Sequence, residues 1–543
     1  MDMLNGEPDQ QRDQNTLHID IFLETYDMIN GITALKISEI YFGSIDAKHE
    51  VEGRTPAEIK YFEDSFVLPP NIDINKYFES KKYYVSGLKG TGKTALLRYI
   101  QIKADKENIK TSFILFKSEF DSYERESLHN SIYAVIPDAD QESKVAYDYE
   151  QAWRMYLYQT IVSLTESGRL DVFQNNTIWS EFKDLIHAVM PINKGVSISL
   201  PKITGGKVTL SKDPKVEIDF ELVDKKKSVS FSEYCRICDA KYKELTPSAT
   251  KNMVFVDELE IRALDDTSTN RDIHLVRDLI VSIDRLNQLS RMLSYNLSFI
   301  LAVRSEVMQS AMSIGKEINK PLFDFGDTLT WGQYSKQKIS HPLLKIIESR
   351  IISTEKLHGI TEHGDVWAKY FRGNFHGKDF REFALEQTWY RPRDMVRLME
   401  VALKSFAGID VLYQKNFDES KRLYATESWV EIGEELSASM TSEEIEGLSR
   451  VLGKFRNPFT IREFKLQMDE LGGIYSEVDV LEKNHKPGEL LKKLYTVGVL
   501  GNYITGKRGN KIPQYAARGN TKVLLEEQFI VHPAVKPFFS TNL

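Results

Sequence analysis

The chain has 543 residues, which is enough for two to four domains of roughly 150 residues each. Its 41% hydrophobic and 28% charged residues form an ordinary globular composition with material for a large core. The formal net charge of −8 excludes binding to nucleic acids through the overall charge, so any such contact needs a local basic surface.

The two cysteines, Cys235 and Cys238, argue against a disulfide-stabilised secreted protein, and no apolar stretch approaches the roughly 18 residues of a membrane span. The N-terminus lacks the apolar core of a signal peptide. We therefore expect a cytoplasmic protein without membrane contact. Since zinc would need two further ligands, we interpret the cysteines as small buried residues on a helix over 231–243.

The first part of the chain predicts strands and helices in alternation. A polar tail covers residues 1–15, and a helix is expected over 21–29. Short apolar runs at 83–86 and 111–116 predict buried strands, and residues 95–100 between them have helical character.

The middle of the chain continues this pattern and adds one insert. Apolar residues alternate with serines or acids across residues 194–223, which predicts a β-hairpin insert. Around the insert we expect helices over 144–166 and 270–293 and buried strands over 254–256 and 299–303. Buried strands separated by helices predict an α/β fold with a parallel sheet.

From about residue 336 onward the pattern is mainly helical. The predicted domains are an N-terminal tail and helix (1–40), an α/β core with the insert (41–335), a helical lid (336–430) and a C-terminal winged helix (431–543).

A complete phosphate-binding motif follows the first buried strand. It consists of Gly87, Leu88, Lys89, Gly90, Thr91, Gly92, Lys93 and Thr94, with Ala95 continuing into the helix. Glycines allow successive backbone N–H groups to face phosphates, and the helix N-terminus adds its positive dipole end. We expect Lys93 to bridge the β- and γ-phosphates and the Thr94 hydroxyl to bind Mg²⁺. The motif predicts binding of Mg·ATP, with GTP as the less favoured nucleotide.

Two acids end the strand over 254–256. In a sheet with such a phosphate loop, Asp257 would hold Mg²⁺ and Glu258 would orient or deprotonate the attacking water. The presence of Glu258 favours hydrolysis over binding alone, although a solvated acidic turn is the alternative interpretation. Arg304 ends the next strand, where a polar side chain can sense the γ-phosphate; a surface arginine at a strand end is the alternative.

The order of these parts resembles bacterial P-loop ATPases of the STAND class and of the origin-recognition (ORC-like, AAA+-related) type. The resemblance also includes an upstream segment from Phe42 to Glu50, which reads FGSIDAKHE, and a lid segment from Arg391 to Asp394, which reads RPRD. It implies that Arg391 or Arg393 reaches the nucleotide from the lid, although ordinary salt bridges at a helix start remain an alternative. It further implies a sensor or regulator in antiviral defence that forms oligomers or acts through a separate effector protein.

The C-terminal segment predicts a winged helix. Helices are expected over 459–467 and 487–497, and strands over 498–504 and 514–517 with a basic loop between them. Residues 483–522 contain nine Lys or Arg and one acid, so DNA contact is one interpretation and protein packing the other.

The sequence therefore predicts an ATPase that works as a molecular switch. The alternatives are a DNA-binding initiator or repair ATPase and a scaffold that binds ATP without turnover.

Overall fold

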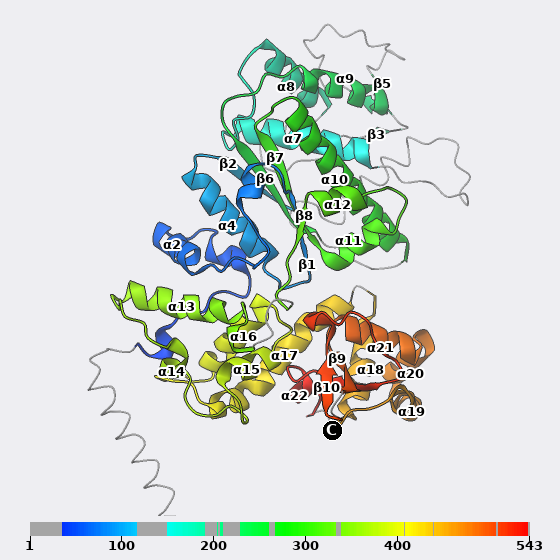
Figure 1. Ribbon diagram of the computed structural model, residues 1–543. Helices are drawn as coiled ribbons and strands as arrows, with labels where there is room; N and C mark the ends of the chain where they lie inside the picture. Colours follow the sequence, from blue (N-terminus) through cyan, green and yellow to red (C-terminus); the bar gives the residue numbers. More distant parts are fainter. Residues whose placement is uncertain are drawn as a thin grey trace, which may run out of the picture.

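The computed structural model describes residues 35–116, 149–189, 203–204, 207–209, 228–259, 266–332, 338–406, 408–437, 439–506 and 509–540. These residues form an α/β part with a central sheet and a largely helical part beside it (Figure 1). The predicted tail and the helix over 21–29 lie outside the described residues.

A five-stranded parallel sheet forms the centre of the α/β part, as predicted from its buried apolar runs. The strand order is β2 (Lys110–Leu115), β6 (Asn252–Leu259), β7 (Leu297–Arg304), β1 (Tyr84–Gly87) and β8 (Gly326–Thr328). The short polar strand β8 was not predicted. Such a sheet is compatible with a P-loop NTPase core.

Helices cover the sheet on both sides. Figure 1 shows α4 (Lys93–Lys106) on one side and α10 (Asp266–Met292) on the other. The helix predicted over 144–166 is α7 (Glu150–Glu166), and its Trp153 Nε1 donates a hydrogen bond of 2.9 Å to the carbonyl oxygen of Leu275 in α10. Because only the short loop 88–92 separates β1 from α4, the first backbone N–H groups of this helix lie at the carboxyl edge of the sheet.

The insert forms a small antiparallel sheet wherever it is described. Strand β4 (Lys207–Thr209) pairs with β3 (Ile203–Thr204) and with β5 (Ser228–Ser230). The remaining residues of the predicted 194–223 insert, Gly205 and Gly206 among them, lie outside the described residues. The next helix, α9 (Phe231–Lys243), buries both cysteines as expected.

The lid region is helical. Its main helices are α13 (Leu344–Leu357), α14 (Val366–Tyr370), α15 (Phe380–Glu386), α16 (Pro392–Lys404) and α17 (Gln414–Leu436). Their apolar side chains share one buried cluster with the C-terminal region and with Ile37, Ile40 and Phe42. The core of the α/β part is a separate cluster that ends at Leu329.

The C-terminal region contains four helices followed by a three-stranded antiparallel sheet. The helices are α18 (Ser442–Gly453), α19 (Ile461–Gly472), α20 (Ser476–Asn484) and α21 (Pro487–Thr496). In the sheet, β9 (Leu500–Thr505) lies between β10 (Lys511–Gln514) and β11 (Gln528–Val531), and the short helix α22 (Lys536–Phe539) follows.

The prediction of a strand over 514–517 was wrong. The strand is β10, which ends at Gln514, and Ala516–Arg518 form a 3-10 turn that Gly519 closes in the left-handed conformation (φ 89°). Arg518 in this turn packs over the rings of Tyr390 and Tyr515, at 4.9 and 4.8 Å from their centroids. A tertiary contact of this kind leaves no periodic signal in the sequence.

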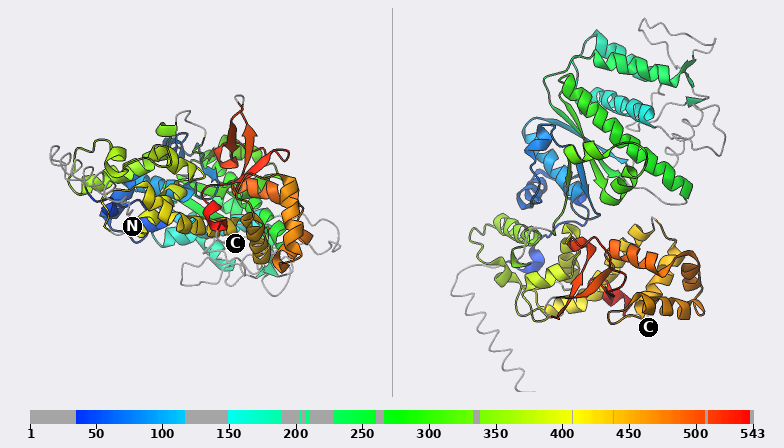
Figure 2. Two further views of the ribbon diagram at one scale, coloured as in Figure 1. Left: turned by 90° about the horizontal axis from the view of Figure 1, so that it is seen from below. Right: turned by 45° about the vertical axis from the view of Figure 1, so that its right-hand side comes forward.

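The C-terminal region docks on the lid next to α16 (Figure 2). Trp389 Nε1 donates a hydrogen bond of 2.7 Å to the carbonyl oxygen of Gly498, and the Trp389 ring stacks on His532 at 4.6 Å. Since Trp389 lies two residues before the segment Arg391 to Asp394, this interface is close in sequence to the predicted nucleotide site.

Among the described residues, none of the helices combines the length and the apolar character that a membrane span requires.

Candidate nucleotide-binding site

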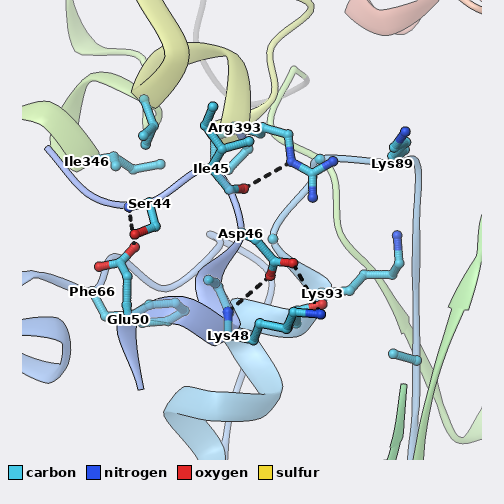
Figure 3. Close-up of a pocket in the computed structure, with 18 of the residues that line it drawn as sticks. Ser44, Ile45, Asp46, Lys48, Glu50, Phe66, Lys89, Lys93, Ile346 and Arg393 are labelled. Carbon is cyan, nitrogen blue, oxygen red and sulfur yellow. Dashed lines mark hydrogen bonds and ion pairs between the residues drawn. The ribbon is translucent and has the colours of Figure 1, made fainter. Parts of the chain in front are cut away.

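A cavity of about 640 Å³ lies between the carboxyl edge of the sheet and the lid (Figure 3). Most of the predicted site residues line it: Lys89, Gly90, Gly92, Lys93, Thr94, Ala95, Asp257, Glu258, Arg304 and Arg393. Arg391, Gly87, Leu88 and Thr91 are not part of its lining. Residues separated by hundreds of positions in the sequence therefore meet in one concave space, as a ligand site requires.

The phosphate-binding loop has the backbone conformation that its glycines predict. Gly90 and Gly92 have φ values of 78° and 94°, which side chains disfavour, and Gly92 caps α4. A Cβ on Gly87 would lie 2.5 Å from Thr91 Oγ1, so a larger residue would collide with the loop. Lys93 Nζ donates to the carbonyl oxygens of Gly87 and Leu88 at 2.8 and 2.9 Å, which holds its ammonium inside the curve of the loop.

Burial lowers the pKa of the Lys93 ammonium to about 8, although Glu306 and Asp257 partly oppose the shift. The protonated form is the one that binds phosphate, and a bound triphosphate would raise this pKa again. Nucleotide affinity should therefore be highest below pH 8 and fall as the pH rises from 8 to 9.5, by up to about tenfold per pH unit.

Equilibrium binding of a fluorescent ATP analogue across this pH range would check the prediction. Lys93→Arg is the control, because a guanidinium stays protonated throughout and should remove the pH dependence even if it weakens binding. A wild-type affinity that stays constant up to pH 9.5 would contradict the assignment.

Asp257 and Glu258 lie near the end of β6, where the backbone is irregular. The register against β7 shifts between Val256 and Leu259, and Glu258 has a φ of 62°. Asp257 is 4% exposed; its Oδ1 accepts the Glu258 N–H at 2.8 Å, and its Oδ2 has no hydrogen-bond partner within the described structure. A buried carboxylate oxygen without a partner, in a cavity that Thr94 also lines, fits a hard divalent cation such as Mg²⁺.

Arg304 ends β7, the strand between β6 and β1. It is paired in register with Gly87, the last residue of β1, and its side chain reaches the same cavity. The predicted sensor position therefore lies beside both the phosphate-binding loop and the acids of β6.

The segment from Ser44 to Glu50 forms another wall of the cavity (Figure 3). Glu50 accepts the Ser44 N–H at 3.1 Å and pairs with Arg350 of α13 at 2.6 Å, while Arg393 Nε donates to the Ile45 carbonyl oxygen at 3.2 Å. Lys48 Nζ lies 3.1 Å from Glu258 Oε1. No role was predicted for these side chains, and the resemblance of this segment was the only signal that could have pointed to them.

Apolar side chains line another part of the cavity. They are Phe62, Phe66, Val67, Pro69, Trp331, Ile346 and Val396. Trp331 is held by a hydrogen bond of 3.0 Å from its Nε1 to the Thr91 carbonyl oxygen. A wall of this kind beside a phosphate-binding loop suits the base of a nucleotide.

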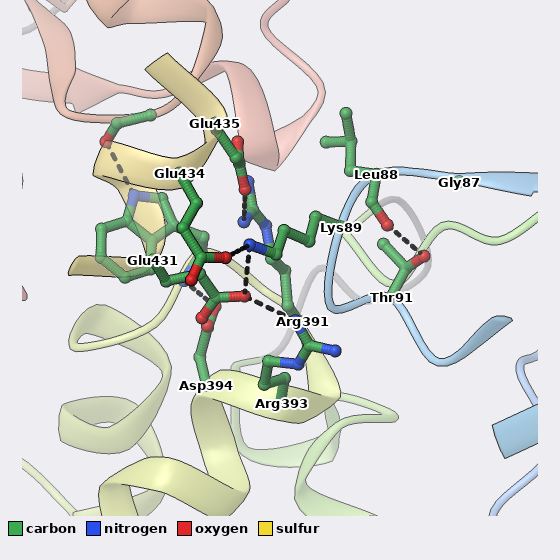
Figure 4. A network of polar contacts seen from close by, with 12 residues as sticks. Gly87, Leu88, Lys89, Thr91, Arg391, Arg393, Asp394, Glu431, Glu434 and Glu435 are labelled. Atoms are coloured by element: carbon green, nitrogen blue, oxygen red, sulfur yellow. Dashed lines mark hydrogen bonds and ion pairs between the residues drawn. The ribbon is translucent and has the colours of Figure 1, made fainter. Parts of the chain in front are cut away.

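Acidic residues at the end of α17 hold the lid arginines and one residue of the phosphate-binding loop (Figure 4). Glu431 pairs with Arg393 at 2.6 Å and with Arg397, and Glu435 pairs with Arg391 at 3.1 Å. Lys89 Nζ lies 2.7 Å from Glu434 Oε2. Arg391 is thus buried in the lid, whereas Arg393 reaches both the lid and the cavity.

Glu431 should contribute strongly to stability. Burial alone would raise its pKa, but the charges of Arg397 and Arg393 outweigh burial and lower this pKa to about 2. This contribution is present above about pH 4.5 and is lost as the pH falls toward 2. At pH 7, Glu431→Gln should reduce the free energy of unfolding by about 3 kcal/mol.

Denaturant unfolding of the full chain would measure this loss. Glu419→Gln is the matched control, because Glu419 is exposed on the same helix and should change stability by less than about 0.5 kcal/mol. Equal midpoints for the two variants would show that the pairs of Glu431 contribute little.

Among family models, the match falls on the predicted lid region. Residues 341–432, which include α13–α16 and most of α17, match the family model of the FunZ-associated C-terminal helical domain. No curated protein matches the chain. A solved structure, "Structure of Drosophila ORC bound to DNA", is similar at 12% identity over 86% of this chain and 93% of that chain, with a TM-score of 0.23. A TM-score this low does not establish a shared fold.

Proposed function

We propose that the protein binds Mg·ATP in this cavity and hydrolyses it to ADP and phosphate. The observation that carries the proposal is the convergence of Lys93, Thr94, Asp257, Glu258 and Arg304 on one cavity. Lys93 would hold the β- and γ-phosphates, and Thr94 and Asp257 would hold Mg²⁺, which neutralises charge on the phosphates. Glu258 would accept a proton from the attacking water, and Arg304 would contact the γ-phosphate.

We further propose that the ATPase is a switch. Arg393 contacts both the cavity and the acidic end of α17, so phosphate groups in the cavity would compete with Glu431 for this cation. The same helix packs against the C-terminal region, where Trp429 contacts Phe539 at 4.9 Å between ring centroids. A change at the nucleotide would thereby reach the C-terminal region.

The proposed output is oligomerisation or the control of a separate effector protein. The support for a role in bacterial antiviral defence is the sequence resemblance to STAND and ORC-like ATPases. An arginine from a neighbouring copy could complete the site, as it does in many P-loop ATPases.

A second candidate is a DNA-binding ATPase, in which the C-terminal region acts as a winged helix. The local excess of Lys and Arg over residues 483–522 supports it. One of these side chains is engaged within the protein, however: Arg518 packs on Tyr390 and Tyr515. This engagement makes the switch the better supported function.

The test is ATP and GTP turnover by the purified full chain with Mg²⁺, with and without duplex DNA, together with the mass of each sample. The switch predicts ATP turnover that DNA leaves unchanged and an ATP-dependent rise in mass. Turnover that DNA accelerates, with a steep salt dependence, would favour the DNA-binding alternative. If the protein binds ATP without hydrolysing it, the result would favour the remaining alternative, a scaffold that binds ATP without turnover.

A further inference from the structure

We propose that Lys48 is a positioning residue for hydrolysis, which orients the carboxylate of Glu258 for its role as general base. This inference deepens the proposed function and rests on it. Lys48 Nζ lies 3.1 Å from Glu258 Oε1, although the two residues are 210 positions apart in the sequence.

Glu258 is a side chain that needs a partner. The strand register shifts next to it and its φ is 62°, so its side chain leaves the regular alternation of the sheet. Its backbone N–H is held by Asp257, but this contact does not fix the three side-chain torsions of a glutamate. An ion pair with Lys48 restricts them, and both side chains are largely shielded from solvent, at 28% and 20% exposure.

The pair holds the Lys48 ammonium as a fixed cation. The hydrogen bond to Glu258 raises the pKa of Lys48, whereas burial lowers it to a smaller extent. Asp46 also contributes, since its Oδ2 lies 3.7 Å from Lys48 Nζ and its Oδ1 accepts the Lys48 backbone N–H at 3.1 Å. Lys48 is therefore anchored at its backbone and charged at its tip.

The anchor of Lys48 belongs to a segment that the lid holds in place. Arg350 of α13 binds Glu50. Arg393 of α16 binds the carbonyl oxygen of Ile45 (Figure 3). A movement of either lid helix would move the segment from Ser44 to Glu50, and Lys48 with it. The orientation of Glu258 is in this way linked to the position of the lid.

The experiment compares wild type, Lys48→Met and Lys48→Arg in the full chain. Three quantities are measured for each: kcat and KM for ATP hydrolysis, and the Kd of a non-hydrolysable ATP analogue. Lys48→Met should lower kcat about tenfold or more and leave the Kd within about twofold, because Lys48 acts on the base rather than on the nucleotide. Lys48→Arg keeps a cation that can pair with Glu258 and should restore most of kcat.

Lys60→Met is the matched control, because Lys60 forms an exposed ion pair with Asp64 on α2 (Pro56–Ser65), outside the cavity. It should leave kcat and Kd unchanged. An unchanged or increased kcat in Lys48→Met would overturn the positioning role alone. A loss of kcat that Lys48→Arg fails to restore would overturn it too, as would a weaker Kd without a change in kcat. Absence of turnover in wild type would refute the proposed function, and the role of Lys48 with it.

Discussion

Glu258→Gln should lower kcat for ATP hydrolysis by about 10²- to 10⁴-fold while ATP still binds. The amide keeps the size of the side chain and can still contact Lys48, but it cannot accept the proton of the attacking water. Since the phosphate-binding loop and Asp257 are unchanged, the Kd for ATP should stay within about threefold. Single-turnover hydrolysis and equilibrium binding on the same preparation would separate the two effects.

Glu317→Gln is the control for this substitution. Glu317 is exposed, pairs with Lys320 at 2.9 Å and does not line the cavity. We expect less than a twofold change in kcat. A Glu258→Gln variant that hydrolyses ATP at the wild-type rate would remove Glu258 from the mechanism and leave the protein's turnover, if any, to another base.

Lys93→Ala should weaken ATP binding by about 100-fold, which corresponds to roughly 3 kcal/mol. The ammonium of Lys93 already lies inside the curve of the loop, 2.8 Å from the carbonyl oxygen of Gly87, so a phosphate group could replace the loop carbonyls with little rearrangement. Titration calorimetry with ATP would measure the change.

Lys89→Ala tests whether this effect is specific to the position of the charge. Both lysines belong to the same loop, but the ammonium of Lys89 is held by Glu434 of α17 at 2.7 Å. We expect its removal to change ATP affinity by no more than about threefold. Equal losses for the two variants would indicate that only the net charge of the loop attracts the nucleotide.

The parts of the fold with a strong local pattern could be predicted from the sequence. The strands β1, β2, β6 and β7 are continuous apolar runs, and α10 has an apolar stripe, so each was found within a few residues of its position. Strand β8 could not be found, because its residues Gly326 to Thr328 are not apolar and pair with β1 only in the folded chain. The position of β10 was also missed, and the turn after it carries a contact of Arg518 with Tyr390, which is far away in the sequence.

The candidate site also contains residues that could be predicted from the sequence and residues that could not. The phosphate-binding loop and the acids of β6 form motifs in which the required residue types are adjacent, and these could be named in advance. Lys48, Arg350 and Glu434 act through contacts with residues far away in the sequence, and a single charged residue has no pattern that distinguishes it from a solvated one. Roles that depend on pairing across the fold therefore need the structure.

The strand order has a consequence for the synthesis of the protein. Strand β1, which precedes the phosphate-binding loop, has its neighbours in β7 and β8, which end at residues 304 and 328. At roughly 5–20 residues per second, a ribosome needs on the order of ten seconds or more to make the intervening chain. During that time the apolar residues Tyr84 and Val85 have no sheet to join, so the nascent chain presents an unpaired strand. The loop that would bind ATP is thus translated early but can take its final shape only after the last strand of the sheet has been added.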